Sequence, residues 1–176
     1  MLFSDRSILT MLHGLVLSGG ALVLLVLALF SLRSIGPRDA IGDNDRNART
    51  FVWVTIGAAT VLWLSVISGT YIVFPMYRAP APEGVAALTH YPRALLMSNP
   101  DTRWLHAFGM EIKEHVPWIA AMLATAAAFT AGRHRAKLFA DPSLRRLTGF
   151  VLAVALVLVS VTALLGVFVN KVAPLW

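Results

Sequence analysis

Four long runs of apolar residues dominate the chain, and the polar residues gather between them. Three runs are clean and cover residues 8–32, 51–75 and 147–172. The remaining run is apolar only over 116–132, but residues 104–115 before it keep helix-forming character. We therefore predict one long helix over 104–132, which we expect Pro117 to bend. Because about 20 apolar residues in a helix cross a hydrocarbon core of about 30 Å, each run is long enough to span a membrane.

The fold class follows from these runs. They are continuous rather than alternating, which excludes a membrane β-barrel. The first run is too long for the apolar part of a signal peptide, so we expect it to be a retained helix. We predict an all-α integral membrane protein whose single domain, residues 1–176, is an up-down bundle of four transmembrane helices.

The basic residues of the connections predict the orientation. Nine of the fifteen lysines and arginines fall in the first and third connections: Arg33, Arg38, Arg46, Arg49, Arg133, Arg135, Lys137, Arg145 and Arg146. Basic loops stay on the cytoplasmic side. Both termini and the second connection are therefore expected on the outer, periplasmic side of a bacterial inner membrane, which the chain crosses several times.

Composition narrows the class further. Of the 176 residues, 57% are hydrophobic and 14% are charged, where soluble domains have about 25% charged residues. This excludes a soluble enzyme. The net charge of +6 suggests binding to anionic lipid rather than to nucleic acid. The absence of cysteine excludes disulfides, thiolate metal sites, iron–sulfur clusters and covalently attached haem.

The second connection, residues 76–103, is long for a loop between packed helices. Its four prolines exclude one continuous helix, but residues 84–97 could form a short helix at the outer interface. A loop of this length is typical of a functional segment.

Ionisable residues are costly inside a bilayer, so the positions of the histidines are informative. Four of the five, His13, His90, His106 and His115, fall toward the outer side. At 1.5 Å per residue, His13 and His115 lie about 10 and 13 Å from the middle of their helices. In an up-down bundle these two helices are diagonal, and two inward imidazoles at similar depth could hold a flat macrocycle. We predict His13 and His115 as axial ligands of the iron of one haem b, with His106 as the alternative to His115.

Other residues could line a haem pocket at this depth in the membrane. Gly20 shares the face of His13, while Trp118 and Met122 share that of His115. Glu111, four residues before His115, could accept the second ring N–H of that histidine. Three basic residues could bind the haem propionates at the outer surface: Arg93, Arg103 and Lys113.

The general architecture resembles that of small four-helix membrane cytochromes b, which hold haem between two helices. That resemblance implies an electron-transfer subunit, rather than a catalytic one, of a larger respiratory or photosynthetic complex. It would pass electrons between a quinol and a periplasmic or partner redox centre, with quinone as a second bound molecule.

Two alternatives stay open. The first is a cofactor-free accessory or assembly subunit of such a complex. The second is a metal-binding or transport protein that holds copper or zinc at the outer face through Glu111, Glu114, His115 and His106. The sequence lacks the motifs of a zinc protease, a P-loop or a serine hydrolase. An absorption spectrum separates haem from both alternatives.

Overall fold

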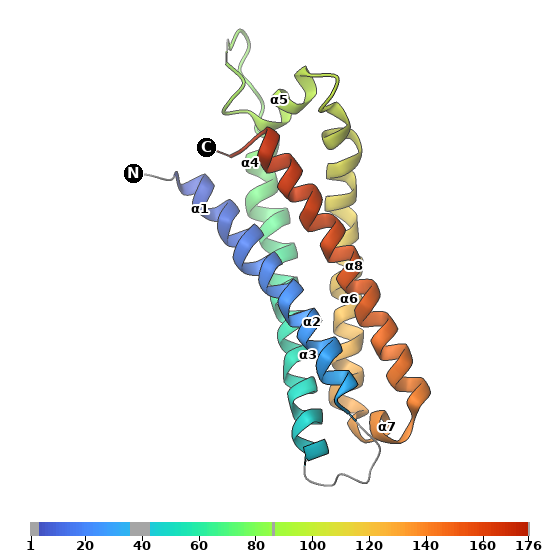
Figure 1. The fold of residues 1–176 in the computed structure, drawn as a ribbon. Helices are drawn as coiled ribbons and strands as arrows, with labels where there is room; N and C mark the ends of the chain where they lie inside the picture. Colours follow the sequence, from blue (N-terminus) through green and yellow to red (C-terminus); the bar gives the residue numbers. More distant parts are fainter. Residues whose placement is uncertain (1–3, 36–42, 86, 176) are drawn as a thin grey trace.

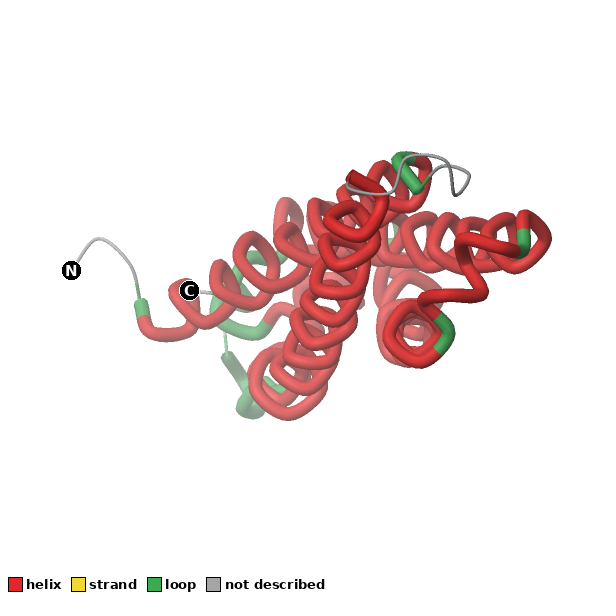
Figure 2. Tube along the Cα trace, turned by 90° about the horizontal axis from the view of Figure 1, so that it is seen from below, coloured by secondary structure: helices red, strands yellow, loops and turns green. Residues whose placement is uncertain are grey.

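The structure, a computed structural model, describes residues 4–35, 43–85 and 87–175. Its long helices lie side by side, and the described residues form helices and loops without a strand (Figures 1 and 2). Three consecutive segments form the first long helical stretch: α1 Asp5–Met11, η1 Leu12–Ser18 and α2 Gly19–Arg33. Three more form the second: α3 Asp43–Ser68, η2 Gly69–Val73 and α4 Phe74–Arg78. The later helices are α5 Pro92–Ser98, η3 Leu105–Met110, α6 Glu111–Arg133, α7 Arg135–Ala140 and α8 Pro142–Val172.

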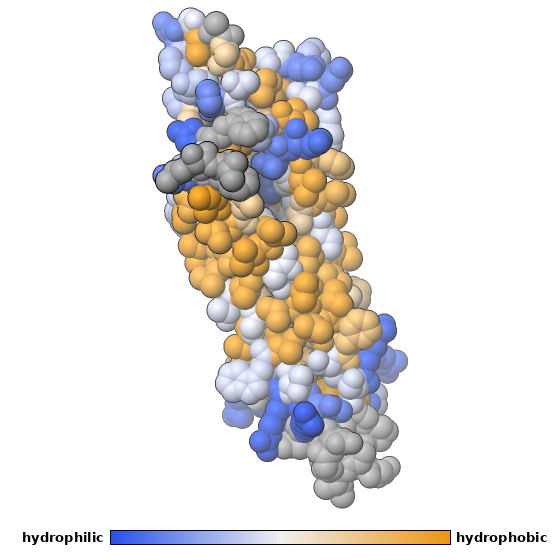
Figure 3. Space-filling model, turned by 60° about the vertical axis from the view of Figure 1, so that its left-hand side comes forward, coloured by the Kyte–Doolittle hydropathy of each residue, from blue (hydrophilic) through white to orange (hydrophobic). Residues whose placement is uncertain are grey.

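Four helical stretches are long and apolar enough to cross a membrane: Asp5–Arg33, Arg46–Arg78, Leu105–Arg133 and Pro142–Val172. We call them the first to fourth spans. A broad apolar belt lies across the middle of the molecule, and hydrophilic residues lie toward both ends (Figure 3). The predictions of an all-helical chain and of a multi-pass integral membrane protein are confirmed.

Small side chains let the spans approach closely. Helix α2 packs against α3 and α8, and α6 packs against the same two helices. The buried residues between them include many alanines: Ala21, Ala28, Ala58, Ala120, Ala124, Ala127, Ala131 and Ala155. In a membrane, where lipid is as apolar as leucine, close van der Waals packing of this kind holds helices together.

The two ends of the molecule contain different parts of the chain. Both chain termini and α5 lie at one end, which we call the terminal end, and α7 lies at the other, which we call the basic end (Figure 1). Arg38 lies outside the described residues; the other basic residues used to predict the orientation lie toward the basic end, in α2, α3, α6, α7 and α8. The fourth span starts there at Pro142, and the Asp141 carboxylate caps it by accepting from the amides of Ser143 and Leu144.

Helix α6 continues through Pro117, in keeping with the single long helix predicted in this region. One other local prediction needs adjustment. The short helix expected over 84–97 is the seven-residue α5, which Pro92 starts because its fixed φ suits a first helical turn. Leu96 of α5 is fully buried in a second apolar cluster at the terminal end, together with Tyr77 and Leu105.

Three of the four spans contain a π-helical segment in the half nearer the terminal end: η1, η2 and η3. Each segment contains a glycine, namely Gly14, Gly69 or Gly109. Such turns are rare and often mark functional sites. The irregular backbone therefore points to the terminal half of the spans.

Candidate intramembrane polar site

His13 lies in η1 and turns toward the second span. Its Nδ1 is 3.0 Å from the hydroxyl of Ser68. The ring also lies against Gly69, where an added Cβ would come within 2.7 Å of Cε1 of His13. Real Cβ atoms essentially never show so close a contact, so only glycine leaves room for the imidazole in this position.

The hydrogen bonds around Ser68 favour one tautomer of His13. The Ser68 hydroxyl donates its single proton to the carbonyl of Ser65, at 3.0 Å. With that bond made, the hydroxyl accepts from His13, which assigns the ring proton to Nδ1 and the lone pair to Nε2. Nε2, which then carries the lone pair, is the atom that can accept a proton, and it lies against Gly69, where an added Cβ would be 3.2 Å away.

Two further serines link the same spans. The hydroxyl of Ser18 donates to the carbonyl of His13 at 3.0 Å, across five residues of the π-helical turn. It lies 2.8 Å from the hydroxyl of Ser65, which must be the donor of that pair because Ser18 has already used its proton. This chain of bonds satisfies polar groups that the bilayer cannot solvate.

Lys113 enters the same region from the third span. Its Nζ lies 3.4 Å from the carbonyl oxygen of Thr162 in the fourth span, a long hydrogen bond. An added Cβ at Gly166 would come within 2.7 Å of Nζ, so this glycine makes space for the ammonium group. Among the described residues Lys113 makes no direct contact with His13, and only a longer-range electrostatic interaction links the two side chains.

This ammonium group is weakly partnered. It carries three N–H donors. Among the described residues no carboxylate lies within salt-bridge distance of it, and it makes only the long bond to Thr162. A cation that is partly buried within a membrane span without a counter-ion is expensive, and such residues usually serve a function. We call His13, Lys113, Ser68 and the two glycines, Gly69 and Gly166, the intramembrane polar site.

His106 lies nearer the terminal end. Its Nδ1 is 2.8 Å from the hydroxyl of the buried Tyr77, so it also packs on the second span. Two of the basic residues expected beside haem propionates, Arg93 and Arg103, lie in or next to the α5 region of this end. Arg103 donates to the carbonyl of Met97 at 3.3 Å.

The side chain of His115 does not lie between the spans. Its side chain is 72% exposed, and its Nδ1 donates to the carbonyl of Glu111 at 2.8 Å. Glu111 thus accepts the ring proton as expected, but through its backbone, and its own carboxylate is 3.9 Å away. His115 follows Lys113 by two residues, or about 200° around a helix, so the two side chains point in opposite directions.

The structure therefore does not bring His13 and His115 together. It places Lys113 within electrostatic range of His13, without a contact between them. The sequence predicts Lys113 at the outer surface, among residues that could bind haem propionates. Helical spacing explains why Lys113 points inward and His115 outward, since residues seven apart lie on the same face of a helix. Lys113 shares its face with the buried Ala120, whereas His115 shares its face with Met122, which is 55% exposed.

The other predicted pocket residues lie apart from His13. A Cβ on Gly20 would be 3.7 Å from Cγ1 of Val61, so Gly20 packs against the second span. Trp118 packs edge-to-face on Trp63 with ring centroids 5.7 Å apart. Within the described residues, no three histidine or acidic side chains are grouped as they would be around a metal ion.

Sequence analysis missed the residues that shape the site. Ser65, Ser68 and Gly69 interrupt an otherwise apolar run, and Gly166 does the same in the fourth span. These interruptions are the signal that could have pointed to the neighbours of His13 and Lys113.

No protein-family model, no curated protein and no solved structure matches the chain. The function is therefore argued from the intramembrane polar site alone.

Proposed function

We propose that the chain is a quinone-binding subunit of a membrane electron-transfer complex. The intramembrane polar site would hold the quinone headgroup. The observation that carries this proposal is that a partly buried histidine, His13, and a weakly partnered lysine, Lys113, lie in the same half of the spans.

A quinone headgroup suits such a pair because it carries two oxygens on an apolar ring. In the quinol form, one hydroxyl would donate to Nε2 of His13. Lys113 would donate to an oxygen of either form through the N–H groups that Thr162 leaves free. Oxidation of the quinol releases two protons and two electrons. Nε2 of His13 would accept one proton and the second would leave to water at the terminal end, while the two electrons would pass singly to a one-electron carrier of the complex, such as haem.

The proposal includes an orientation and a packing arrangement. Basic loops favour the cytoplasmic side, so the terminal end would face the periplasm. The contacts of α2, α3, α6 and α8 support an up-down four-helix bundle, in which the site lies in the outer half of the membrane.

Haem b bound by this chain is the second candidate. It is favoured by the tautomer assigned to His13, which donates from Nδ1 and keeps Nε2 for a metal. His13 would ligate the iron. His106, which turns toward the second span, suits the second axial position better than the exposed His115. Haem would supply one-electron chemistry.

Binding of a tail-less benzoquinone or naphthoquinone to the purified protein tests the first candidate. We expect quenching of tryptophan fluorescence on binding. Lys113→Met should weaken the affinity about 10- to 100-fold, because a hydrogen bond to a charged group contributes about 1.5–3 kcal/mol. His13→Ala should also weaken it, and His134→Ala, at the basic end, is the matched control. Unchanged affinity in both site variants would refute the assignment.

An absorption spectrum tests the second candidate on the same preparation. A Soret band that shifts on reduction, and that His13→Ala and His106→Ala remove while His115→Ala does not, supports haem ligation by this chain. Retention of the band in His13→Ala contradicts it.

A further inference from the structure

Each of the four spans carries an exposed aromatic side chain near the basic end, and an arginine about one turn closer to that end. The exposed fractions of the four aromatic residues lie between 60% and 71%, and the four arginines are exposed as well. The pairs are Phe30 with Arg33, Trp53 with Arg49, Phe129 with Arg133, and Phe150 with Arg146. We call these eight residues the arginine–aromatic girdle.

The order of the residues in each pair reverses with the direction of the chain. The first and third spans run toward the basic end, and in them the aromatic residue precedes the arginine (Figure 1). The second and fourth spans run away from that end, and in them the arginine precedes the aromatic residue. Residues three or four apart share one face of a helix. In all four spans, therefore, the arginine lies beyond the aromatic residue on the same exposed face.

Contacts between the spans place the pairs at a common level. A Cβ on Gly149 would be 3.4 Å from Cδ2 of Leu32, so the first and fourth spans meet next to Phe30 and Phe150. Helices α2 and α6 both end at the arginine of their pair. Because α2 and α6 each pack against α3 and α8, every span keeps one outward face, and the girdle surrounds the molecule.

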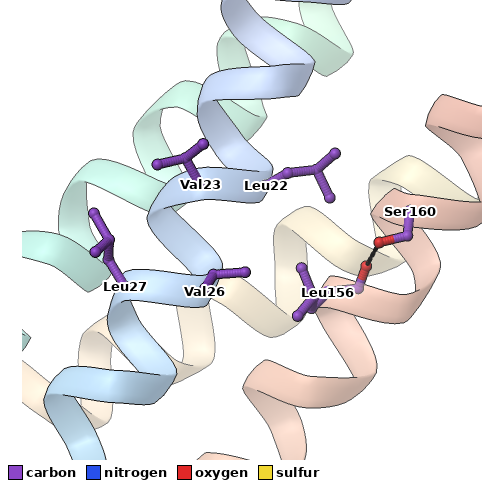
Figure 4. Close-up of a pocket in the computed structure, with 6 residues that line it drawn as sticks. All are labelled: Leu22, Val23, Val26, Leu27, Leu156 and Ser160. Atoms are coloured by element: carbon purple, nitrogen blue, oxygen red, sulfur yellow. Dashed lines mark hydrogen bonds between the residues drawn. The ribbon is translucent and has the colours of Figure 1, made fainter.

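The surface on the side of the girdle toward the middle of the spans is apolar. A hollow of about 470 Å³ lies there between α2 and α8. It is lined by Leu22, Val23, Val26, Leu27, Leu156 and Ser160 (Figure 4). Ser160 donates its proton to the carbonyl of Leu156 at 2.7 Å, so it offers no donor to a neighbour. Hydrophilic residues follow on the other side of the girdle, toward the basic end (Figure 3). The girdle therefore lies where acyl chains give way to headgroups.

The excess positive charge of the chain is concentrated at this level. Residues 33–49 and 133–146 contain nine basic and four acidic residues, whereas the rest of the chain contains six and five. The planar guanidinium group of arginine matches a phosphate group with two parallel hydrogen bonds. Aromatic side chains such as tryptophan favour the boundary between membrane and water.

We propose that the arginine–aromatic girdle binds anionic phospholipids of the leaflet at the basic end. The arginines hold the phosphate groups, and the aromatic side chains lie among the acyl chains directly beneath. A soluble anion would meet the charges but leave the aromatic side chains exposed, whereas a phospholipid satisfies both. A zwitterionic lipid carries its own cation beside the phosphate, so the excess of arginine favours an anionic one. This inference goes beyond the quinone proposal and does not depend on it.

Competition between two lipids provides the test. The full chain in a non-ionic detergent is mixed with equal amounts of phosphatidylglycerol and phosphatidylcholine that have the same acyl chains, and bound lipid is counted by native mass spectrometry. We expect about fivefold more bound phosphatidylglycerol, the factor for one basic residue at an anionic surface. Combining Arg33→Gln, Arg133→Gln and Arg146→Gln should abolish this preference. The matched control removes the same charge at the terminal end and should keep the preference; it combines Arg6→Gln, Arg103→Gln and Lys171→Gln.

Two outcomes of this competition overturn the proposal. One is equal binding of both lipids to the unmodified protein. The other is an equal loss of preference in the matched control, because net charge alone would then explain the binding. Soluble glycerol phosphate carries the phosphate group without acyl chains and should not displace the lipid. Displacement would show a site for free phosphate instead.

A second measurement requires no arginine variant to fold. In phosphatidylcholine vesicles, brominated phosphatidylglycerol should quench the tryptophan fluorescence more strongly than the same share of brominated phosphatidylcholine. Trp53→Phe should remove this difference, because Trp53 is the one tryptophan of the girdle. A difference that persists in Trp53→Phe would place the anionic lipid elsewhere and overturn the assignment.

Discussion

The position of the His13 imidazole depends on the missing side chain of Gly69. A methyl group there would lie 2.7 Å from the ring, so Gly69→Ala must displace either the histidine or the helix. We expect a loss of about 1–3 kcal/mol in stability, the usual cost of overpacking, together with weaker quinone binding. Gly57→Ala is the control, since its Cβ would meet Leu24 at an ordinary 3.8 Å. Thermal unfolding in detergent measures the stability of both variants. Equal unfolding midpoints for Gly69→Ala and Gly57→Ala would contradict the packing argument.

At the scale of a helix, the fourth span depends on its first turn. The Asp141 carboxylate accepts from the amides of Ser143 at 2.8 Å and Leu144 at 3.3 Å, which have no partner within the helix. Asp141→Ala should lower stability by about 0.5–2 kcal/mol, while Asp141→Asn, which keeps a capping oxygen, should lose less. Thermal unfolding, monitored by circular dichroism, distinguishes the two variants. A loss as large in the asparagine variant would show that charge, not capping, stabilises this end.

At the scale of the whole molecule, the expected orientation can be tested with single cysteines because the chain contains none of its own. Ser98 is exposed at the terminal end and Ser143 at the basic end. In intact cells, a membrane-impermeant thiol reagent should label Ser98→Cys, and it should label Ser143→Cys only after permeabilisation. Basic loops are retained in the cytoplasm, which gives this direction. The reverse labelling pattern would mean that the intramembrane polar site faces the cytoplasmic half of the membrane.

The chemistry of the site was only partly predictable from the sequence. His13 could be singled out because it is an ionisable residue within a clean apolar run. The inward direction of Lys113 also has a sequence signal, since residues 113, 120 and 127 share one face of α6 and two of them are buried alanines. His115, Met122 and Phe129 share another face, and all three are exposed. The serines and glycines opposite His13 belong to other spans, so sequence spacing could not place them beside it.

The number of spans, their approximate limits and the segregation of basic residues followed from the sequence by itself. The bilayer imposes a fixed apolar length on every crossing, and that length can be counted along the chain. The tertiary structure alone decided which ionisable groups meet. Rotating an apolar helix about its axis changes little in its own hydrogen bonds, so the rotation is set by contacts with neighbouring spans. Those contacts turn Lys113 toward Gly166 and His13 toward Gly69, and they leave His115 outside.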